Sequence, residues 1–91
     1  VYHIFGINSA GTDMRRVNGD QFASSDCMFP DIRSDGRVVF SSYFNNRFTL
    51  ATCLFDGSEY NYNLTPGFAG DCFRPKWSPE GTKIVFSHFN G

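Results

Sequence analysis

The chain lacks long apolar runs, an excess of charge of one sign and closely spaced cysteines. No apolar run approaches the roughly 18 residues that a membrane-spanning helix needs, so we expect no membrane span. Lys and Arg number 8 against 9 for Asp and Glu, and the net charge of −1 gives no reason to expect a nucleic-acid partner. With 91 residues, the chain is one small domain or part of a larger one.

Sequence motifs of catalysis are also missing. The chain contains no P-loop, no GxSxG, no HExxH and no pair of carboxylates that the sequence can place together. Cys27, Cys53 and Cys72 have no CxxC spacing and are odd in number, which excludes an all-cysteine zinc site and a complete disulfide framework within one chain. No Cys/His arrangement for nucleophilic catalysis is visible, so the sequence names no reaction.

Aromatic residues and turn signals are abundant instead. The chain has 11 Phe, 4 Tyr and 1 Trp. Its apolar runs, such as 38–40 and 84–86, are short, β-branched and aromatic, which favours strands. Ala10-Gly11, Asp35-Gly36, Asp56-Gly57 and Glu80-Gly81 are typical of tight turns, and no window shows sustained helical periodicity. We therefore expect eight strands, at about 2–8, 13–17, 28–34, 37–42, 48–54, 59–64, 73–78 and 83–88.

The sequence repeats itself at a spacing of 45 to 46 residues. The matched pairs are Asp26 and Asp71, Cys27 and Cys72, Pro30 and Pro75, Gly36 and Gly81, Phe40 and Phe86, Ser41 and Ser87, and Gly11 and Gly57. The chain is thus two repeats long, with four expected strands in each. Four short antiparallel strands per repeat of roughly 40–50 residues indicate an all-β fold made of β-propeller blades.

The second copy of the repeat resembles a known family. Pro75-Lys76-Trp77-Ser78-Pro79-Glu80-Gly81-Thr82-Lys83-Ile84-Val85-Phe86-Ser87 is similar to the TolB-like, WD-like β-propeller repeat. The segment from Pro30 to Phe40 is a degenerate copy with Ile32 in place of the tryptophan. The motif residues in the two copies are Pro30, Asp35, Gly36, Phe40, Pro75, Trp77, Ser78, Gly81 and Phe86.

The resemblance also implies a phase for the repeat. A blade of this family starts at the strand that carries the P-x-W-S-P motif, so the chain would begin in the middle of a blade. Residues 1–26 would form the outer half of one blade, 27–66 a complete blade and 67–91 the inner half of a third. Each cut leaves an open strand edge, and proteins rarely leave such edges unpaired.

The two open ends are expected to complement each other, because 87–91 followed by 1–4 parallels the internal segment 41–50. The seam residues would be His3, Ile4, Phe5, Ile84, Val85 and Phe86. Either the segment belongs to a longer chain of about six to eight blades, or copies associate head to tail as a ring or filament. We expect proline at Ile4 or Val85 to abolish pairing at the seam, because it removes a backbone donor.

Several side chains have both a structural and a functional interpretation. Asp26 and Asp71 are weak candidates for a Ca²⁺ site, and otherwise bond nearby backbone amides at the entry of the inner strands. His3 and His88 are ordinary strand residues or a seam site for protons or metal. Cys27 and Cys72 lie at equivalent points of successive blades, too far apart to bridge, so we expect free thiols. The aromatics expected to be exposed are Tyr43, Phe44, Tyr60, Tyr62, Phe68 and Phe89.

The resemblance implies a non-enzymatic scaffold for protein–protein interaction or self-assembly, without a cofactor, in the periplasm or outside the cell. Its partner would be another protein or further copies of the chain. The alternative is an accessory propeller of a secreted or periplasmic hydrolase or lyase. Both rest on the fold of the family rather than on a reactive site in this sequence.

Overall fold

The computed structural model describes residues 1–22 and 24–90, and these residues form an all-β structure. They include seven strands and a short 3-10 turn, η1 (Asp20–Phe22). No helix in this part of the chain is long and apolar enough to cross a membrane. The strands are β1 (Phe5–Gly6), β2 (Arg15–Arg16), β3 (Cys27–Ile32), β4 (Arg37–Phe44), β5 (Arg47–Leu54), β6 (Asp71–Trp77) and β7 (Ile84–Phe89).

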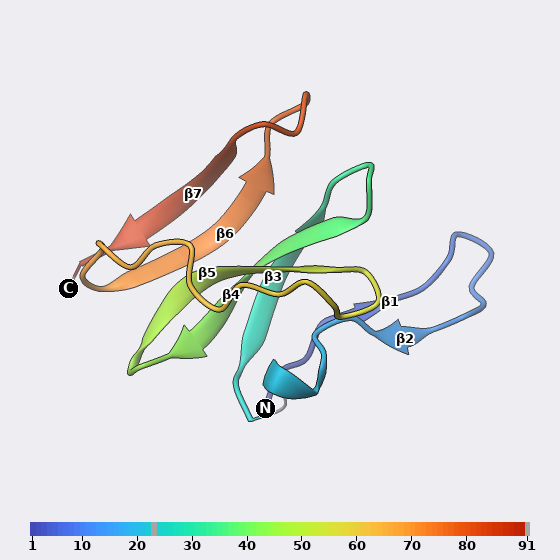
Figure 1. Ribbon diagram of the computed structural model, residues 1–91, viewed down its shortest axis with the longest axis horizontal. Helices are drawn as coiled ribbons and strands as arrows, with labels where there is room; N and C mark the ends of the chain where they lie inside the picture. The colour runs from blue at the N-terminus through green and yellow to red at the C-terminus, as the bar shows by residue number, and fades with distance from the viewer. Residues whose placement is uncertain (23, 91) are drawn as a thin grey trace.

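The strands form three separate antiparallel sheets that follow one another along the molecule (Figure 1). β1 pairs with β2, β3–β4–β5 form the central sheet, and β6 pairs with β7. In the central sheet, β4 and β5 pair over their whole length, from Arg37 opposite Leu54 to Phe44 opposite Arg47. The turn between them places Asn45 and Asn46 at positive φ, which matches the twist of the two strands.

The eighth strand expected at 59–64 is not formed, and this expectation was wrong. The segment forms one bridge with β5, where Thr52 and Asn61 exchange backbone hydrogen bonds of 3.0 and 2.8 Å. The N–H of Leu64 also donates to the carbonyl of Leu50 at 2.8 Å. The side chain of Asn61 then accepts from the N–H of Asn63, whose own side chain accepts from the N–H of Thr65. These local side-chain bonds compete with a regular ladder, so the segment runs beside β5 without forming a strand.

The N-terminal hairpin is also shorter than the expected strands at 2–8 and 13–17. The buried side chain of Asn18 is one cause, because its Oδ1 accepts from the N–H of Ile4 at 2.8 Å. Near the tip, the side chain of Asn8 accepts from the N–H of Thr12 at 3.0 Å. Side-chain oxygens thus satisfy backbone donors that a longer ladder would use, and only two residue pairs remain in β1 and β2.

The repeat is visible in the backbone of β3 and β6. The register shifts around Pro30 in β3 and around Pro75 in β6, which is a β-bulge in each strand. The residues before the prolines, Phe29 and Arg74, both have positive φ, at 57° and 51°. Proline cannot donate to a ladder, so the bulge falls where the ladder already lacks a donor. The two prolines were the sequence signal for this feature.

Four turns repeat in the same way. Gly11, Gly36, Gly57 and Gly81 have φ values between 78° and 92°. Each donates its N–H to the carbonyl three residues earlier in the chain. Positive φ is costly for residues with a Cβ, which explains why glycine stands at all four positions.

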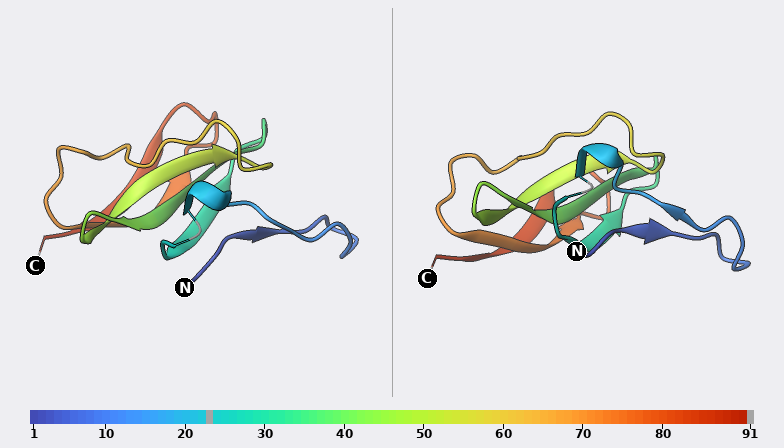
Figure 2. Two further views of the ribbon diagram at one scale, coloured as in Figure 1. Left: turned by 60° about the horizontal axis from the view of Figure 1, so that its bottom comes forward. Right: turned by 90° about the horizontal axis from the view of Figure 1, so that it is seen from below.

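The core lies on one face of the central sheet, beneath the N-terminal hairpin and η1 (Figure 2). Phe40 is fully buried there, with Val17, Phe22 and Cys53 at most 1% exposed. The β6–β7 sheet packs on the opposite face, where the hydroxyl of Ser41 donates to the carbonyl of Cys72 at 3.0 Å. The central sheet is therefore covered on both faces by other parts of the chain.

The three cysteines are buried and free, so the expectation of free thiols is confirmed. Burial raises the pKa of Cys53 to about 11 and also raises the pKa of Cys27 above its ordinary value. A thiol with a raised pKa stays protonated at neutral pH and is a poor nucleophile. Cys27 and Cys53 consequently act as small apolar core residues.

Truncation of the core tests this packing. We expect Phe40→Ala to lower the free energy of unfolding by about 3–5 kcal/mol, because it removes a fully buried ring and leaves a cavity. Met14→Ala, at a side chain that is 69% exposed, should change it by less than about 0.5 kcal/mol. Urea denaturation followed by far-UV circular dichroism measures both, and equal effects would contradict the core assignment.

Candidate interaction surfaces

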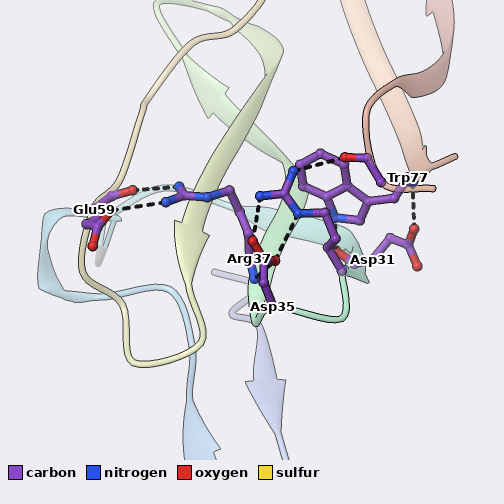
Figure 3. Close-up of polar contacts among 7 residues, drawn as sticks. Asp31, Asp35, Arg37, Glu59 and Trp77 are labelled. Atoms are coloured by element: carbon purple, nitrogen blue, oxygen red, sulfur yellow. Dashed lines mark hydrogen bonds and ion pairs between the residues drawn. The ribbon is translucent and has the colours of Figure 1, made fainter. Parts of the chain in front are cut away.

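The central sheet and the β6–β7 sheet are joined at one end by Asp31 and Trp77 (Figure 3). The backbone N–H of Trp77 donates to Asp31 Oδ2 at 2.7 Å, and its indole Nε1 donates to the Asp31 carbonyl at 3.2 Å. The guanidinium of Arg33 lies 4.4 Å from the centre of the Trp77 ring and donates to the carbonyl of Gly81 at 3.0 Å. Trp77, the last residue of β6, thus connects the β6–β7 sheet to the central sheet. We call the contacts among Asp31, Arg33 and Trp77 the inner staple.

A salt bridge holds the arginine of the inner staple in place. Arg33 donates to both carboxylate oxygens of Asp35, at 2.9 and 2.8 Å, and the N–H of Arg37 donates to the same carboxylate. These donors lower the pKa of Asp35 to about 2, mainly through Arg33. Since this folded-state pKa lies below the ordinary value, the contact favours folding above about pH 4 and is lost as the pH falls toward 2.

Asp26 and Asp71 make the same contact in the two repeats. Asp26 accepts from the backbone N–H of Tyr2 at 2.7 Å, and Asp71 accepts from the N–H of Phe48 at 2.9 Å. Asp26 therefore ties the start of β3 to the segment before β1, and Asp71 ties the start of β6 to β5. Among the residues that the structure describes, no group of three or more His, Cys, Asp or Glu side chains is placed to hold a metal ion.

An aromatic surface lies at the outer side of the central sheet. Tyr62 stacks on Phe44 with ring centres 5.7 Å apart, and it contacts Tyr60 and the buried Phe22 edge-on at 5.1 and 5.3 Å. Tyr60 and Tyr62 are 46% and 38% exposed, so a buried ring supports two accessible ones. Of the other aromatics expected at the surface, those exposed are Tyr43, Phe68 and Phe89.

Several strand edges are open in the described residues, among them those of β7 and β1. β7 pairs only with β6, and β1 pairs only with β2. Large apolar side chains are exposed at both edges: Val85 and Phe89 on β7, and Val1, Tyr2, Phe5 and Ile7 in and around β1. Exposed apolar edges of this kind are templates for pairing with another strand.

His3 and His88 have different neighbours in the structure. His3 accepts from the side-chain amide of Asn18 at 3.0 Å, next to the N-terminal hairpin. His88 on β7 packs on Phe68 at 4.9 Å between ring centres and bonds to the carbonyl of Ala69. Neither histidine contacts the other within the chain.

Sequence reasoning missed the inner staple. Asp31 and Arg33 are not repeated, since Lys76 and Ser78 stand at the equivalent positions. A repeat pattern shows residues that recur, whereas this contact forms between unlike residues of the two copies. The departure from the repeat was the signal that could have drawn attention to Asp31.

The inner staple predicts a stability effect for Asp31. We expect Asp31→Ala to lower the free energy of unfolding by about 1.5–3 kcal/mol, because the amide of Trp77 loses a charged acceptor. Asp20→Ala removes an exposed ion pair with Arg16 and should cost less than about 1 kcal/mol. Denaturation followed by Trp77 fluorescence measures both, and a neutral Asp31→Ala would contradict the role of the inner staple.

Comparison with known proteins gives one curated relative. The chain is 31% identical over 81 residues to the Tol-Pal system protein TolB of Gluconobacter oxydans (strain 621H). The aligned segment is 89% of this chain and 17% of that protein, so the chain spans about a sixth of the length of the curated relative it matches. No family model matches the chain. No solved structure matches it either. The chain is therefore similar to a segment of TolB along most of its length.

Proposed function

We propose that the chain is a non-enzymatic segment of a TolB-like β-propeller that serves as a scaffold for protein–protein contacts. Residues 1–26 are the outer half of one blade, 27–66 a complete blade and 67–91 the inner half of the next. The observation that carries the proposal is the recurrence of one contact at the start of β3 and of β6. Asp26 bonds the amide of Tyr2, and 45 residues later Asp71 bonds the amide of Phe48.

The packing of the sheets supports this proposal. In a propeller, each blade is a small antiparallel sheet that stacks on the blades before and after it. The central sheet here is covered by the N-terminal hairpin on one face and by the β6–β7 sheet on the other. The bulges at Pro30 and Pro75 give both inner strands the same local shape. The curated relative is named a Tol-Pal system protein, which is consistent with a role in protein contacts.

The scaffold acts through its loops and exposed rings rather than through a reaction. Aromatic side chains are enriched at the cores of protein interfaces, and Tyr60 and Tyr62 are accessible for such contacts. The segment works without a cofactor, in the periplasm or outside the cell, as the resemblance of its repeat implies. Its blades provide a rigid frame from which these loops project.

A tandem chain tests whether the three sheets are blades. Three copies joined from the last residue of one to the first of the next would supply six blade equivalents. We expect this chain to unfold in one cooperative transition at a higher temperature than the single chain, because every internal edge finds a neighbour. Calorimetry and small-angle scattering measure the transition and the shape.

A matched control uses the same tandem chain with Phe5→Lys in every copy, which places a charge at each joint. That variant should unfold at a lower temperature than the parent tandem. A parent tandem that unfolds like independent single chains, with an extended shape in scattering, contradicts the blade assignment.

A further inference from the structure

Resting on the proposed function, we propose that the edge of β7 binds residues 1–7 of a second copy of this chain, in a register that the pairing of β4 with β5 defines. The direction of the backbone groups at the edges of β7 and β1 sets this register. Along an antiparallel strand, successive residues direct their N–H and C=O alternately to one side and the other. Each edge therefore offers only every second residue to a new strand.

On β7, the available residues are Ile84, Phe86 and His88. The carbonyl of Lys83 accepts from the N–H of Ser78, so residue 83 faces β6. By alternation, Val85 also directs its N–H and C=O toward β6, whereas Ile84, Phe86 and His88 direct theirs toward the open edge. β4, the equivalent of β7 in the first repeat, shows the same alternation. There, the N–H of Tyr43 donates to the carbonyl of Asp26, on the side of β3.

At the N-terminal edge, the available residues are His3, Phe5 and Ile7. The carbonyl of Ile4 accepts from the N–H of Val17 at 2.8 Å, and its N–H donates to Asn18. Ile4 is thus engaged within its own hairpin, and by alternation its neighbours face outward. This corrects the earlier expectation for proline variants, because Ile4 and Val85 both direct their N–H groups into their own sheets rather than to the seam.

The repeat spacing predicts how the available residues of β7 pair with those of the N-terminal edge. β4 pairs with β5 as Val38 opposite Cys53, Phe40 opposite Ala51 and Ser42 opposite Thr49. A shift of 46 residues forward on β4 and 46 back on β5 converts these pairs into Ile84 with Ile7, Phe86 with Phe5, and His88 with His3. The paired residues are the ones that the hydrogen bonds leave available at the two edges. The sequence spacing and the backbone geometry are independent observations, and they give one register.

The side chains of the joint reproduce an internal contact. Tyr43 and Phe48 oppose each other across β4 and β5, with ring centres 5.2 Å apart. Their equivalents are Phe89 and Tyr2 of the second copy, which are 60% and 67% exposed in the single chain. Phe5 of the second copy, 59% exposed, would lie beside Phe86. Pairing therefore covers the apolar surface that distinguishes both edges.

The face of the β6–β7 sheet takes part as well. Ser41 donates to the carbonyl of Cys72 between the two internal sheets. Ser87, its equivalent on β7, is exposed and would donate to the carbonyl of Cys27 in the second copy. The inner staple has no counterpart in the joint, since Lys76 replaces Asp31 and Ile32 replaces Trp77. We therefore expect the joint to be weaker than the internal contact between sheets.

Sedimentation equilibrium of the 91-residue chain tests the association. We expect particles at multiples of 10.3 kDa, whose population grows with concentration. Phe5→Lys should raise the dissociation constant by about tenfold or more, because it places a charge in the joint. Met14→Lys introduces the same charge at an equally exposed position of the hairpin outside the joint, and should leave association unchanged.

Disulfide trapping tests the register. Tyr43 and Phe48 face one another at a pair that exchanges no backbone bonds, where side chains approach most closely, and Phe89 and Tyr2 inherit that geometry. A mixture of Phe89→Cys and Tyr2→Cys chains should form a cross-linked dimer under mild oxidation. A mixture of Phe89→Cys and Phe5→Cys chains, which are out of register, should cross-link at least about tenfold more slowly.

Two results would overturn the proposal: equal cross-linking of the two mixtures, or a chain that stays monomeric while Trp77 fluorescence shows that its sheets are folded. The second result would mean that the β7 edge does not bind a second copy of the chain. Neither result contradicts the blade assignment by itself, because the tandem chain tests the blades without requiring separate copies to associate.

Discussion

The pairing of β4 with β5 is the interaction on which the rest of the structure depends. It runs without interruption over eight residues of each strand and sets which side chains face each neighbouring sheet. Because side chains alternate along a strand, a slip of one residue would turn Phe40 away from the core and Ser41 away from Cys72. The turn at Asn45 and Asn46 holds the register at one end.

Contacts between the sheets depend on this register but use different chemistry in each place. Asp26 and Asp71 tie the starts of β3 and β6 to backbone amides earlier in the chain, and these contacts recur with the sequence repeat. The inner staple of Asp31, Arg33 and Trp77 joins the same sheets through residues that do not recur. The repeat therefore sets the common architecture, and residues that depart from it add a contact between the central sheet and the β6–β7 sheet.

Much of this architecture is encoded in patterns that a single sequence displays. The glycine turns, the β-branched runs and the spacing between Pro30 and Pro75 predicted an all-β chain with a repeated strand order. The strand expected at 59–64 is not formed, because the side chains of Asn61 and Asn63 accept from backbone N–H groups two residues later and compete with the ladder. Asn18 shortens the first hairpin in a similar way. Side-chain to backbone bonds of this kind depend on three-dimensional placement, which periodicity does not report.

The central claim is that the chain holds its sheets as blades and that the edges of β1 and β7 are complementary. Residue-resolved amide hydrogen exchange, at low and high protein concentration, tests it most directly. The account predicts that the N–H of Val85 is protected at both concentrations, whereas those of Phe86 and Phe5 gain protection only as the chains associate. Amides of Phe86 and Phe5 that exchange equally fast at both concentrations, in a chain shown to have associated, would contradict the account.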